Sequence, residues 1–281
     1  MNHVAIISHG HEDLLIASKL GGLLDERALL TIWVKDNLPK PDADAPNRLK
    51  DFCLEHGIFY TNEQAGLGFG HNNNFLFELI QRERGFGPQD IFLVMNPDIT
   101  VSVATLSALV ARMQRSKHAM ATLNLYRDHT LQIKDSNIRH FPGVVSILKM
   151  PVVNSFSETY DKEQIEEFGL GVISVEVEWA SGAFLAFTPE HYAALGGFDP
   201  HYFMYFEDVD ICYRSRKYLK RAVHFYPDLK AVHTAAHKNR NIASQHARWF
   251  FQSFFKFLMR RYFLFRQPYL GSTNALTKTD V

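Results

Sequence analysis

The sequence predicts an α/β fold in which a mostly parallel sheet is flanked by helices and followed by a basic, aromatic C-terminal helix. Short apolar runs that suit buried strands alternate with stretches of about ten to fifteen residues that suit helices, a pattern typical of parallel sheets. Charge is distributed unevenly, because positions 229–279 hold nine Lys or Arg and no acid, whereas 158–178 hold seven acids and one Lys.

The elements are expected in a regular order over the first 123 residues. Strands are expected at 3–8, 29–34, 57–62, 90–95 and 118–123, and helices at 12–24, 46–56, 75–84 and 102–115. The region from about 126 to 178 is interpreted as loops with short elements. The remaining elements are a strand pair at 175–187, helices at 188–197 and 209–219, and strands at 222–227 and 230–237.

Composition excludes several classes of protein. The formal net charge is zero, so no global basic field points to a nucleic-acid partner. Cys53 and Cys212 indicate no disulfide framework, and a reducing cytosolic setting is the default. The N-terminal apolar stretch is short and lacks a basic n-region, so it does not predict a signal peptide. The sequence contains no run of eighteen uncharged apolar residues, so it predicts no membrane-spanning helix.

Polar residues follow several predicted strands, at the edge where open α/β sheets bind ligands. Ser8, Asp36, Asn62 and Asp98 all occupy such positions. In "NPDI" (96–99), oxygen-bearing side chains suit a hard divalent cation and a diphosphate. A simple turn or helix cap also explains the same residues, and Pro97 favours that alternative.

Two further motifs are ambiguous when taken alone. "GLGFGHNNN" (66–74) suits close approach of a phosphate or sugar before a helix, but a flexible turn also explains it. "AVHTAAH" carries His233 and His237, and an imidazole at a strand end suits a metal site shared with Asp98. The chain has 14 histidines, so a structural role is the alternative.

The stretch "HYFMYFEDVDICYR" (201–214) places three acids, Glu207, Asp208 and Asp210, directly after aromatic residues. Acids at the start of a helix are favoured by its dipole, so capping explains one of them. Three are more than a cap requires. We therefore expect one acid to organise the helix and another to serve as a general base that takes a proton from a hydroxyl.

Taken in order, these motifs resemble those of the inverting family 2 glycosyltransferases, which have the GT-A fold. The pattern comprises SHGHE, a strand ending in Asp-Asn, GFGHNNN, NPDI, WASGAF, GGFD, FMYFEDVDICYR and a late histidine, and it covers about residues 3–237. It is most similar to bacterial O-antigen rhamnosyltransferases, which implies dTDP-L-rhamnose as donor and an N-acetylglucosamine-diphospho-polyprenol acceptor. The implied domains are a transferase domain over 1–237, with a nucleotide-binding half (1–123) and an acceptor half (124–237), and a tail over 238–281.

The resemblance also implies a role for each residue at a matching motif. The base and ribose pocket is expected to contain Ser8, His9, Asp36 and Asn37. The donor's phosphates and sugar are expected to face Gly68, Phe69, Gly70, Asn73 and Asn74. A Mg²⁺ or Mn²⁺ cofactor is assigned to Asn96, Asp98 and His233, where Asn96 departs mildly from the family's aspartate. The implied base is Asp208 with Glu207 beside it, and the residues near the sugar and acceptor are Trp179, Ser181 and Gly182.

Two other functions fit the same motifs. One is a transferase of this fold that uses a UDP-hexose or UDP-N-acetylhexosamine donor, because sequence alone barely separates donors within a fold. The other is a non-catalytic protein that binds a glycan. The joint presence of Asp98, Asp208 and His233 argues against the second alternative.

The tail "RWFFQSFFKFLMRRYFLFRQP" (248–268) has nine aromatic residues, five Lys or Arg and no acid. One hypothesis is a helix docked on the catalytic domain or on a partner subunit. The other is a helix lying in the membrane interface, with rings at the headgroup boundary and cations on anionic lipid. The second hypothesis is the one we adopt, so we expect a peripheral protein on the cytoplasmic face of the membrane, and an oligomer remains open.

Overall fold

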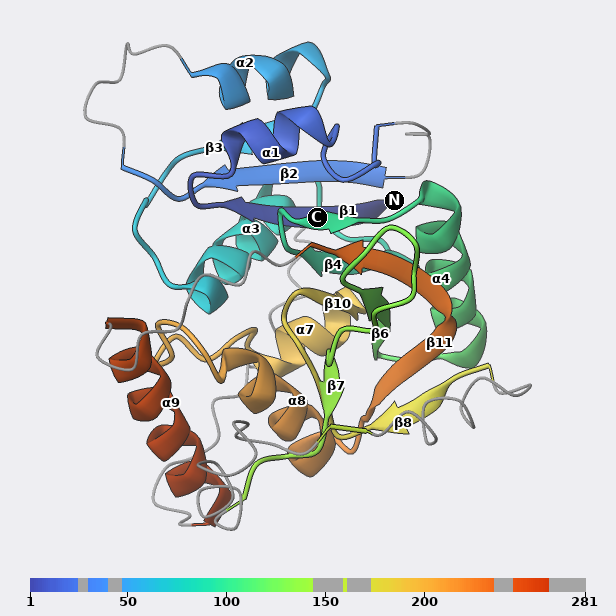
Figure 1. Cartoon of the computed structure of the whole chain (residues 1–281), viewed down its shortest axis with the longest axis vertical. Coiled ribbons are helices and arrows are strands. Elements are labelled where there is room, and N and C mark those ends of the chain that lie inside the picture. The colour runs from blue at the N-terminus through green and yellow to red at the C-terminus, as the bar shows by residue number, and fades with distance from the viewer. Residues whose placement is uncertain (25–29, 40–46, 144–158, 161–172, 235–244, 263–281) are drawn as a thin grey trace, which may run out of the picture.

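The computed structural model describes residues 1–24, 30–39, 47–143, 159–160, 173–234 and 245–262. These residues form a nine-stranded sheet with helices on both faces (Figure 1). The strand order is β3-β2-β1-β4-β10-β6-β11-β5, and β8 pairs with β11. The predicted mostly parallel α/β sheet is therefore confirmed, with antiparallel strands added to it.

The parallel half of the sheet carries the strand ends of interest. It consists of β1 (Asn2–Ser8), β2 (Leu30–Asp36), β3 (Phe59–Thr61) and β4 (Phe92–Met95). The other half consists of β10 (Phe184–Phe187), β6 (Met120–Tyr126), β11 (Val223–His233), β5 (Ile99–Thr100) and β8 (Val175–Val177). Strand β10 is antiparallel to β4 and β6, while β6 and β11 are parallel. A separate pair is formed by β7 (Ile138–Arg139) and β9 (Trp179–Ala180).

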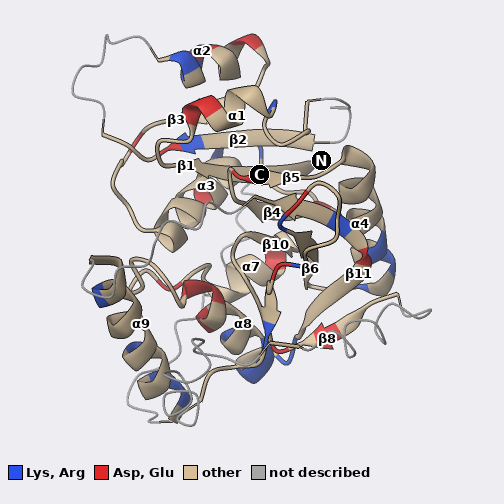
Figure 2. Ribbon diagram, viewed as in Figure 1, with Lys and Arg blue, Asp and Glu red and all other residues tan. Residues whose placement is uncertain are grey.

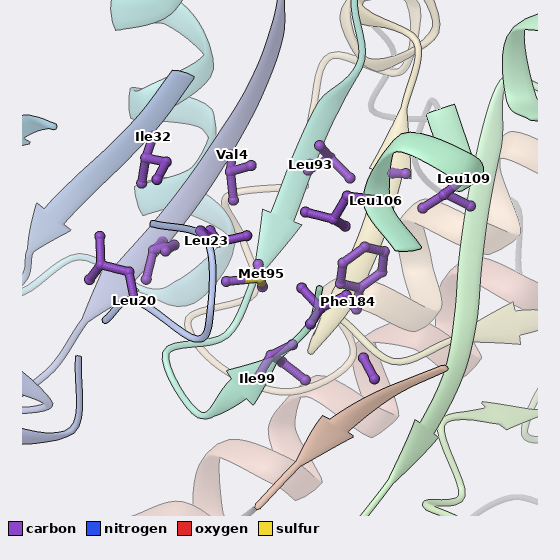
Figure 3. Packing of buried hydrophobic residues seen from close by; sticks show 14 of the residues in the cluster. Val4, Leu20, Leu23, Ile32, Leu93, Met95, Ile99, Leu106, Leu109 and Phe184 are labelled. Atoms are coloured by element: carbon purple, nitrogen blue, oxygen red, sulfur yellow. The ribbon is translucent and has the colours of Figure 1, made fainter. Parts of the chain in front are cut away.

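Helices cover the two faces of the sheet. They are α1 (Glu12–Ala17), α2 (Arg48–Glu55), α3 (Phe69–Glu83), α4 (Val103–Ser116), α7 (Pro189–Leu195), α8 (Glu207–Tyr218) and α9 (Gln245–Tyr262). Side chains alternate along each strand, so Val4 joins the core beneath α1, α2 and α4, while Ala5 joins the core beneath α3, α7 and α8. Figure 3 shows the first core, where Leu106 of α4 packs near Leu93.

Some predicted boundaries were wrong. The first helix ends at Ala17 instead of residue 24. Lys19, Leu20 and Gly21 all have left-handed backbones, and a Cβ on Gly21 would lie 2.0 Å from the carbonyl oxygen of Ile99. The third helix starts at Phe69 rather than residue 75, so most of the predicted glycine turn is helical.

Two other differences concern the second half of the chain. The predicted strands at 222–227 and 230–237 form one strand, β11, whose register shifts between Tyr226 and Lys230. Positions 144–158, 161–172 and 235–244 lie outside the described residues, and so does His237.

Helix α9 is docked on the rest of the fold. Phe254, Phe257 and Leu258 are buried in the same core as α7 and α8. This is the docking that one of the two hypotheses for the tail predicted, and Figure 1 shows α9 beside the rest of the fold. Within the described part of the chain, no helix has the length and apolarity needed to cross a membrane.

Candidate active site

Polar residues predicted at the sheet edge lie at the ends of neighbouring strands. Ser8 ends β1 and Asp36 ends β2, and the two residues are register partners. Tyr60 donates a hydrogen bond of 3.2 Å to the carboxylate of Asp36. Ser8 and Asp36 are buried, whereas His9 is exposed. The edge is therefore assembled as expected, and its role as a base and ribose pocket stays a prediction.

Asn37 holds the glycine segment against this edge. Its main-chain N–H donates to the carbonyl of Ser8 at 2.8 Å. Its Oδ1 accepts from the N–H groups of Gly66 (3.0 Å) and Leu67 (3.2 Å), and its Nδ2 donates to the carbonyl of Leu67 (2.9 Å). These contacts give the Asn37 side chain a scaffolding role.

The glycines at the start of α3 allow a close approach of the chain to itself. A Cβ on Gly68 would lie 2.2 Å from the carbonyl oxygen of Phe203, and one on Gly70 would lie 2.7 Å from Cβ of Phe198. The N–H of Phe69 also donates to the carbonyl of Phe203 at 3.2 Å. These positions thus need glycine because α3 contacts the segment before α8, whatever ligand it also meets.

Two asparagines of α3 make hydrogen bonds within the protein, and those of Asn74 strengthen this contact. Asn73 is buried and donates to the carbonyl of Phe69 at 3.0 Å. Asn74 donates to the carbonyl of Phe198 (2.8 Å) and accepts from its N–H (2.9 Å) and from the hydroxyl of Tyr192 (2.7 Å). Their predicted contacts with a donor stay predictions, and their observed contacts are with protein.

The turn after β4 lies beside the end of β11. Ile99 pairs with His233, which places Asp98 near the imidazole. Oδ1 of Asp98 is 3.4 Å from Nε2 of His233, and Oδ2 of Asp135 is 2.7 Å from Nδ1. The structure thus brings together Asp98 and His233, two of the three predicted metal ligands, and adds Asp135, which sequence analysis did not assign.

Opposite charges stabilise each other in this cluster. Burial lowers the pKa of His233, but the carboxylates of Asp135 and Asp98 outweigh burial and raise that pKa to about 9. Burial raises the pKa of both acids, yet interaction with His233 brings each below its usual value. Asp135 carried no sequence signal, because it lies in the irregular region. Its N–H donates to the carbonyl of Leu125 in β6, which pairs with the strand that ends at His233.

The atoms at Asp98 suit a divalent cation. Its Oδ1 is buried, and its 3.4 Å ion-pair contact with Nε2 of His233 is too long for a strong hydrogen bond, which leaves the carboxylate incompletely satisfied. Asp135 holds Nδ1 of His233, the arrangement by which carboxylates orient metal-binding histidines. The described residues contain no ready group of three or more His, Cys, Asp or Glu side chains for a metal. A site with two protein side chains would suit the way Mg²⁺ is commonly bound, through one or two carboxylates together with phosphates of the substrate.

Asp208 lies across a short segment from this turn. The N–H of Gly182 donates to Oδ2 of Asp208 at 3.0 Å, and a Cβ on Gly182 would lie 3.4 Å from Cβ of Asp208. The carbonyl of Ala183 accepts from the N–H of Asn96 at 2.8 Å. The Gly182–Ala183 segment therefore connects Asp208 with the turn that carries Asn96 and Asp98.

Burial perturbs both acids at the start of α8. Burial raises the pKa of Asp208, and the N–H of Gly182 and the charge of Arg139 oppose that rise only in part. Burial together with the charge of Asp208 raises the pKa of Glu207 well above its usual range. A carboxylate with a raised pKa is suited to accept a proton in catalysis.

The third acid has a structural environment. Asp210 is fully buried and accepts a 2.6 Å hydrogen bond from Nε of Arg214 and another from Arg260 of α9. The residue before α8, Phe206, makes no side-chain cap in the described structure. Asp210 therefore organises the helix, as expected of one of the three acids, whereas the chemical role of Asp208 stays a prediction and no side chain supplies an N-cap.

The residues predicted near the sugar and acceptor, Trp179, Ser181 and Gly182, lie at different distances from Asp208. Trp179 is buried, and its indole N–H donates to the carbonyl of His140 at 2.9 Å. Ser181 is half-buried, and its hydroxyl accepts from the N–H of Ala183 at 3.2 Å. Ser181 and Gly182 are thus next to Asp208, while Trp179 supports the segment from within.

Comparison with protein families supplies the observation that decides the family. The model described as Glycosyltransferase like family 2 matches residues 63–252, a range that includes α3, the turn with Asp98, and Asp208. The chain belongs to glycosyltransferase family 2. It is a glycosyltransferase, as its motifs predicted.

Relatives of this family 2 glycosyltransferase agree. Rhamnosyltransferase WbbL of Escherichia coli (strain K12) is 32% identical over 262 residues, which cover 93% of this chain and 94% of that protein. The N-acetylglucosaminyl-diphospho-decaprenol L-rhamnosyltransferase of Mycobacterium tuberculosis is 28% identical over 208 residues, covering 70% and 66% of the two chains. The predicted resemblance to rhamnosyltransferases is therefore confirmed.

Solved structures of glycosyltransferases share the fold. GalNAc-T7 with UDP, GalNAc and Mn²⁺ matches with a TM-score of 0.67 at 14% identity, over 92% of this chain and 47% of that one. The mannosyltransferase PcManGT of Pyrobaculum calidifontis with GDP-Man and Mn²⁺ matches with a TM-score of 0.54 at 12% identity, over 84% and 57%. The chain spans about half the length of these proteins. The likeness confirms the GT-A fold.

Proposed function

We propose that this family 2 glycosyltransferase transfers L-rhamnose from dTDP-L-rhamnose to a lipid-linked diphospho-sugar during synthesis of an O-antigen or related surface polysaccharide. The observation that carries the proposal is the 32% identity to rhamnosyltransferase WbbL along 93% of the chain. The mycobacterial relative, whose name specifies an N-acetylglucosaminyl-diphospho-decaprenol acceptor, supports the class of acceptor.

Asp208 is the proposed general base. It takes the proton from the acceptor hydroxyl, whose oxygen attacks the anomeric carbon from the face opposite the nucleotide. The bond to the diphosphate breaks, dTDP leaves with the electron pair, and the configuration inverts. The sugar passes through an oxocarbenium-like state, as in glycoside hydrolysis. The raised pKa of Asp208 and its place beside Gly182 support this role.

Asp98 and His233, with Asn96 in the same turn, are the proposed residues for Mg²⁺ or Mn²⁺. The cation supplies positive charge that stabilises a leaving diphosphate. Asp135 fixes the orientation of the His233 ring through its 2.7 Å contact with Nδ1. The buried Oδ1 of Asp98, which has only a 3.4 Å contact with Nε2 of His233, supports the assignment.

The outer face of α9 supports a place at the cytoplasmic face of the membrane. Phe251, Phe255, Met259 and Tyr262 are exposed at spacings of four and three residues, and their exposed fractions run from 37% to 58%. Such a stripe suits an interfacial helix. A lipid-linked acceptor would meet the enzyme at that surface.

Three of the four cations of α9, all but Arg248, contribute less to this surface than the sequence suggested. Lys256 donates to the carbonyl of His201, Arg260 binds Asp199 and Asp210, and Arg261 donates to the carbonyl of Phe141. We therefore expect membrane binding to depend mainly on the rings. Phe255→Ser should reduce sedimentation with liposomes more than 0.5 M salt does, and the reverse result would restore the electrostatic hypothesis.

A donor panel tests the proposed function. The full chain is incubated with dTDP-L-rhamnose, UDP-glucose, UDP-N-acetylglucosamine or GDP-mannose, a synthetic N-acetylglucosaminyl-diphospho-lipid, and Mg²⁺ or Mn²⁺. Mass spectrometry should detect acceptor heavier by one deoxyhexose only with dTDP-L-rhamnose. A product formed with a UDP-sugar instead would select the alternative donor. Tight dTDP binding with no product from any donor would favour the non-catalytic alternative.

A further inference from the structure

Two consecutive aromatic residues with left-handed backbones lie directly before the catalytic helix. The φ angles of Tyr205 and Phe206 are 69° and 67°. This conformation is uncommon for bulky side chains and persists only where the surroundings impose it. Because Phe206 directly precedes Glu207 and Asp208, the turn sets the direction in which the chain enters α8 and so the positions of both acids.

Helix α9 packs against this turn and the chain before it. Oγ of Ser253 donates to the carbonyl of Met204 at 3.0 Å. The ring of Phe206 lies 5.3 Å from that of Phe254 and 5.8 Å from that of Phe257, measured between centroids. The turn is thus covered by a helix that follows it by some forty residues.

Arg260 of α9 joins the two sides of the turn. Its Nη2 donates to Asp199, which precedes the turn, and its Nη1 donates to Asp210, which follows it. Both carboxylates are fully buried, and 9% of the Arg260 side chain is exposed. Figure 2 shows the acids at the start of α8 and the basic residues of α9. A planar guanidinium with several donors can hold two carboxylates in fixed positions.

We propose that Arg260 is a positioning residue, which holds the Tyr205–Phe206 turn and thereby aims Asp208 at the acceptor hydroxyl. The catalytic part of this inference rests on the proposed transfer reaction. Arg260 itself touches neither substrate nor reacting atoms in this account, and it acts through Asp199 and Asp210.

Arg261 offers a matched control on the same helix. It also makes hydrogen bonds with its guanidinium, but to the main-chain carbonyls of Phe141 (2.9 Å) and Pro142 (2.6 Å). We compare Arg260→Met, Arg260→Lys and Arg261→Met in the full chain. The transfer rate is expressed per dTDP-binding site, measured by calorimetric titration, so that loss of folded protein does not count as loss of catalysis.

We expect Arg260→Met to lower kcat at least tenfold while the KM for donor changes less than threefold, and Arg260→Lys to recover part of the loss. Arg261→Met should leave both constants within threefold of wild type. Equal losses in Arg260→Met and Arg261→Met, or an unchanged kcat in Arg260→Met, would overturn the proposal.

Hydrogen exchange tests the same contact without turnover. Peptides covering residues 199–212 should exchange faster in Arg260→Met and at the wild-type rate in Arg261→Met. An unchanged exchange rate in Arg260→Met overturns the proposal even if wild type transfers no sugar. Inactive wild type with the expected exchange pattern contradicts the proposed function and leaves the hold on the turn intact.

Discussion

The turn after β4 and the first turn of α8 both present carboxylates, but their partners differ. Asp98 lies in a cluster with His233 and Asp135, where opposite charges lower the pKa of each acid. At α8, burial raises the pKa of Glu207 and Asp208. The first arrangement keeps its carboxylates ionised beside a protonated His233, whose proton a cation bound at Nε2 would displace, and the second favours taking up a proton.

At the start of α8, Asp208 and Asp210 are only two residues apart and also differ in their partners. Asp210 is enclosed by Arg214 and Arg260, whereas Asp208 accepts hydrogen bonds from main-chain N–H groups. Burial alone therefore does not distinguish a catalytic acid from a structural one. The partners do, because Asp210 is held between two guanidinium groups, whereas Asp208 accepts from the main-chain N–H groups of Gly182 and Val209.

The largest expected effect on stability comes from Asp210→Asn. Removing one partner of a buried ion pair typically costs about 3–5 kcal/mol. Urea denaturation should show a loss of this size. Asp228→Asn is the control, because Asp228 makes a bidentate pair with Arg112 at 2.7 Å on the surface, and exposed pairs contribute about 0–1 kcal/mol. Equal losses in the two variants would remove the structural role of Asp210.

Asp98→Ala should abolish most of the difference in dTDP affinity measured with and without Mn²⁺. Asp135→Ala should act through the orientation of His233, and loss of such a partner typically lowers metal affinity about 10–100-fold. Calorimetry with and without EDTA checks both. Each variant should match wild type in EDTA, and an unchanged effect of Mn²⁺ in both would exclude this cluster as the metal site.

Glu207→Gln should produce the smallest change, and its sign depends on pH. An acid with a raised pKa in the folded state contributes stability at low pH, which is lost as pH rises through the folded pKa. Above the ordinary Glu pKa of 4.5, wild type should therefore lose about 1 kcal/mol per pH unit more than Glu207→Gln. Urea melts at pH 5, 6 and 7 measure the slopes, and parallel slopes would mean that Glu207 titrates normally.

The sequence predicted most of the fold because the apolar alternation along strands such as β1 reports directly on burial. It also singled out Asp98, His233 and Asp208, since each sits in a local motif, and the structure brings Asp98 and His233 together, while their roles stay predictions. Asp135 and Arg260 could not be predicted, because their partners are far away in the sequence. Asp135 is 98 residues from His233, and Arg260 is 61 residues from Asp199 and 50 from Asp210. The glycine segment suggested a ligand, whereas in the structure Gly68 makes its close approach to the backbone of Phe203.

Single-turnover transfer by Asp208→Asn tests the central claim most directly. The substitution keeps the size of the side chain and removes its capacity as a base. The rate from bound dTDP-L-rhamnose to lipid-linked acceptor should fall at least about a hundredfold, as expected for a lost general base, while dTDP affinity stays within threefold of wild type. A rate near that of wild type would contradict the account and transfer the role of base to Glu207.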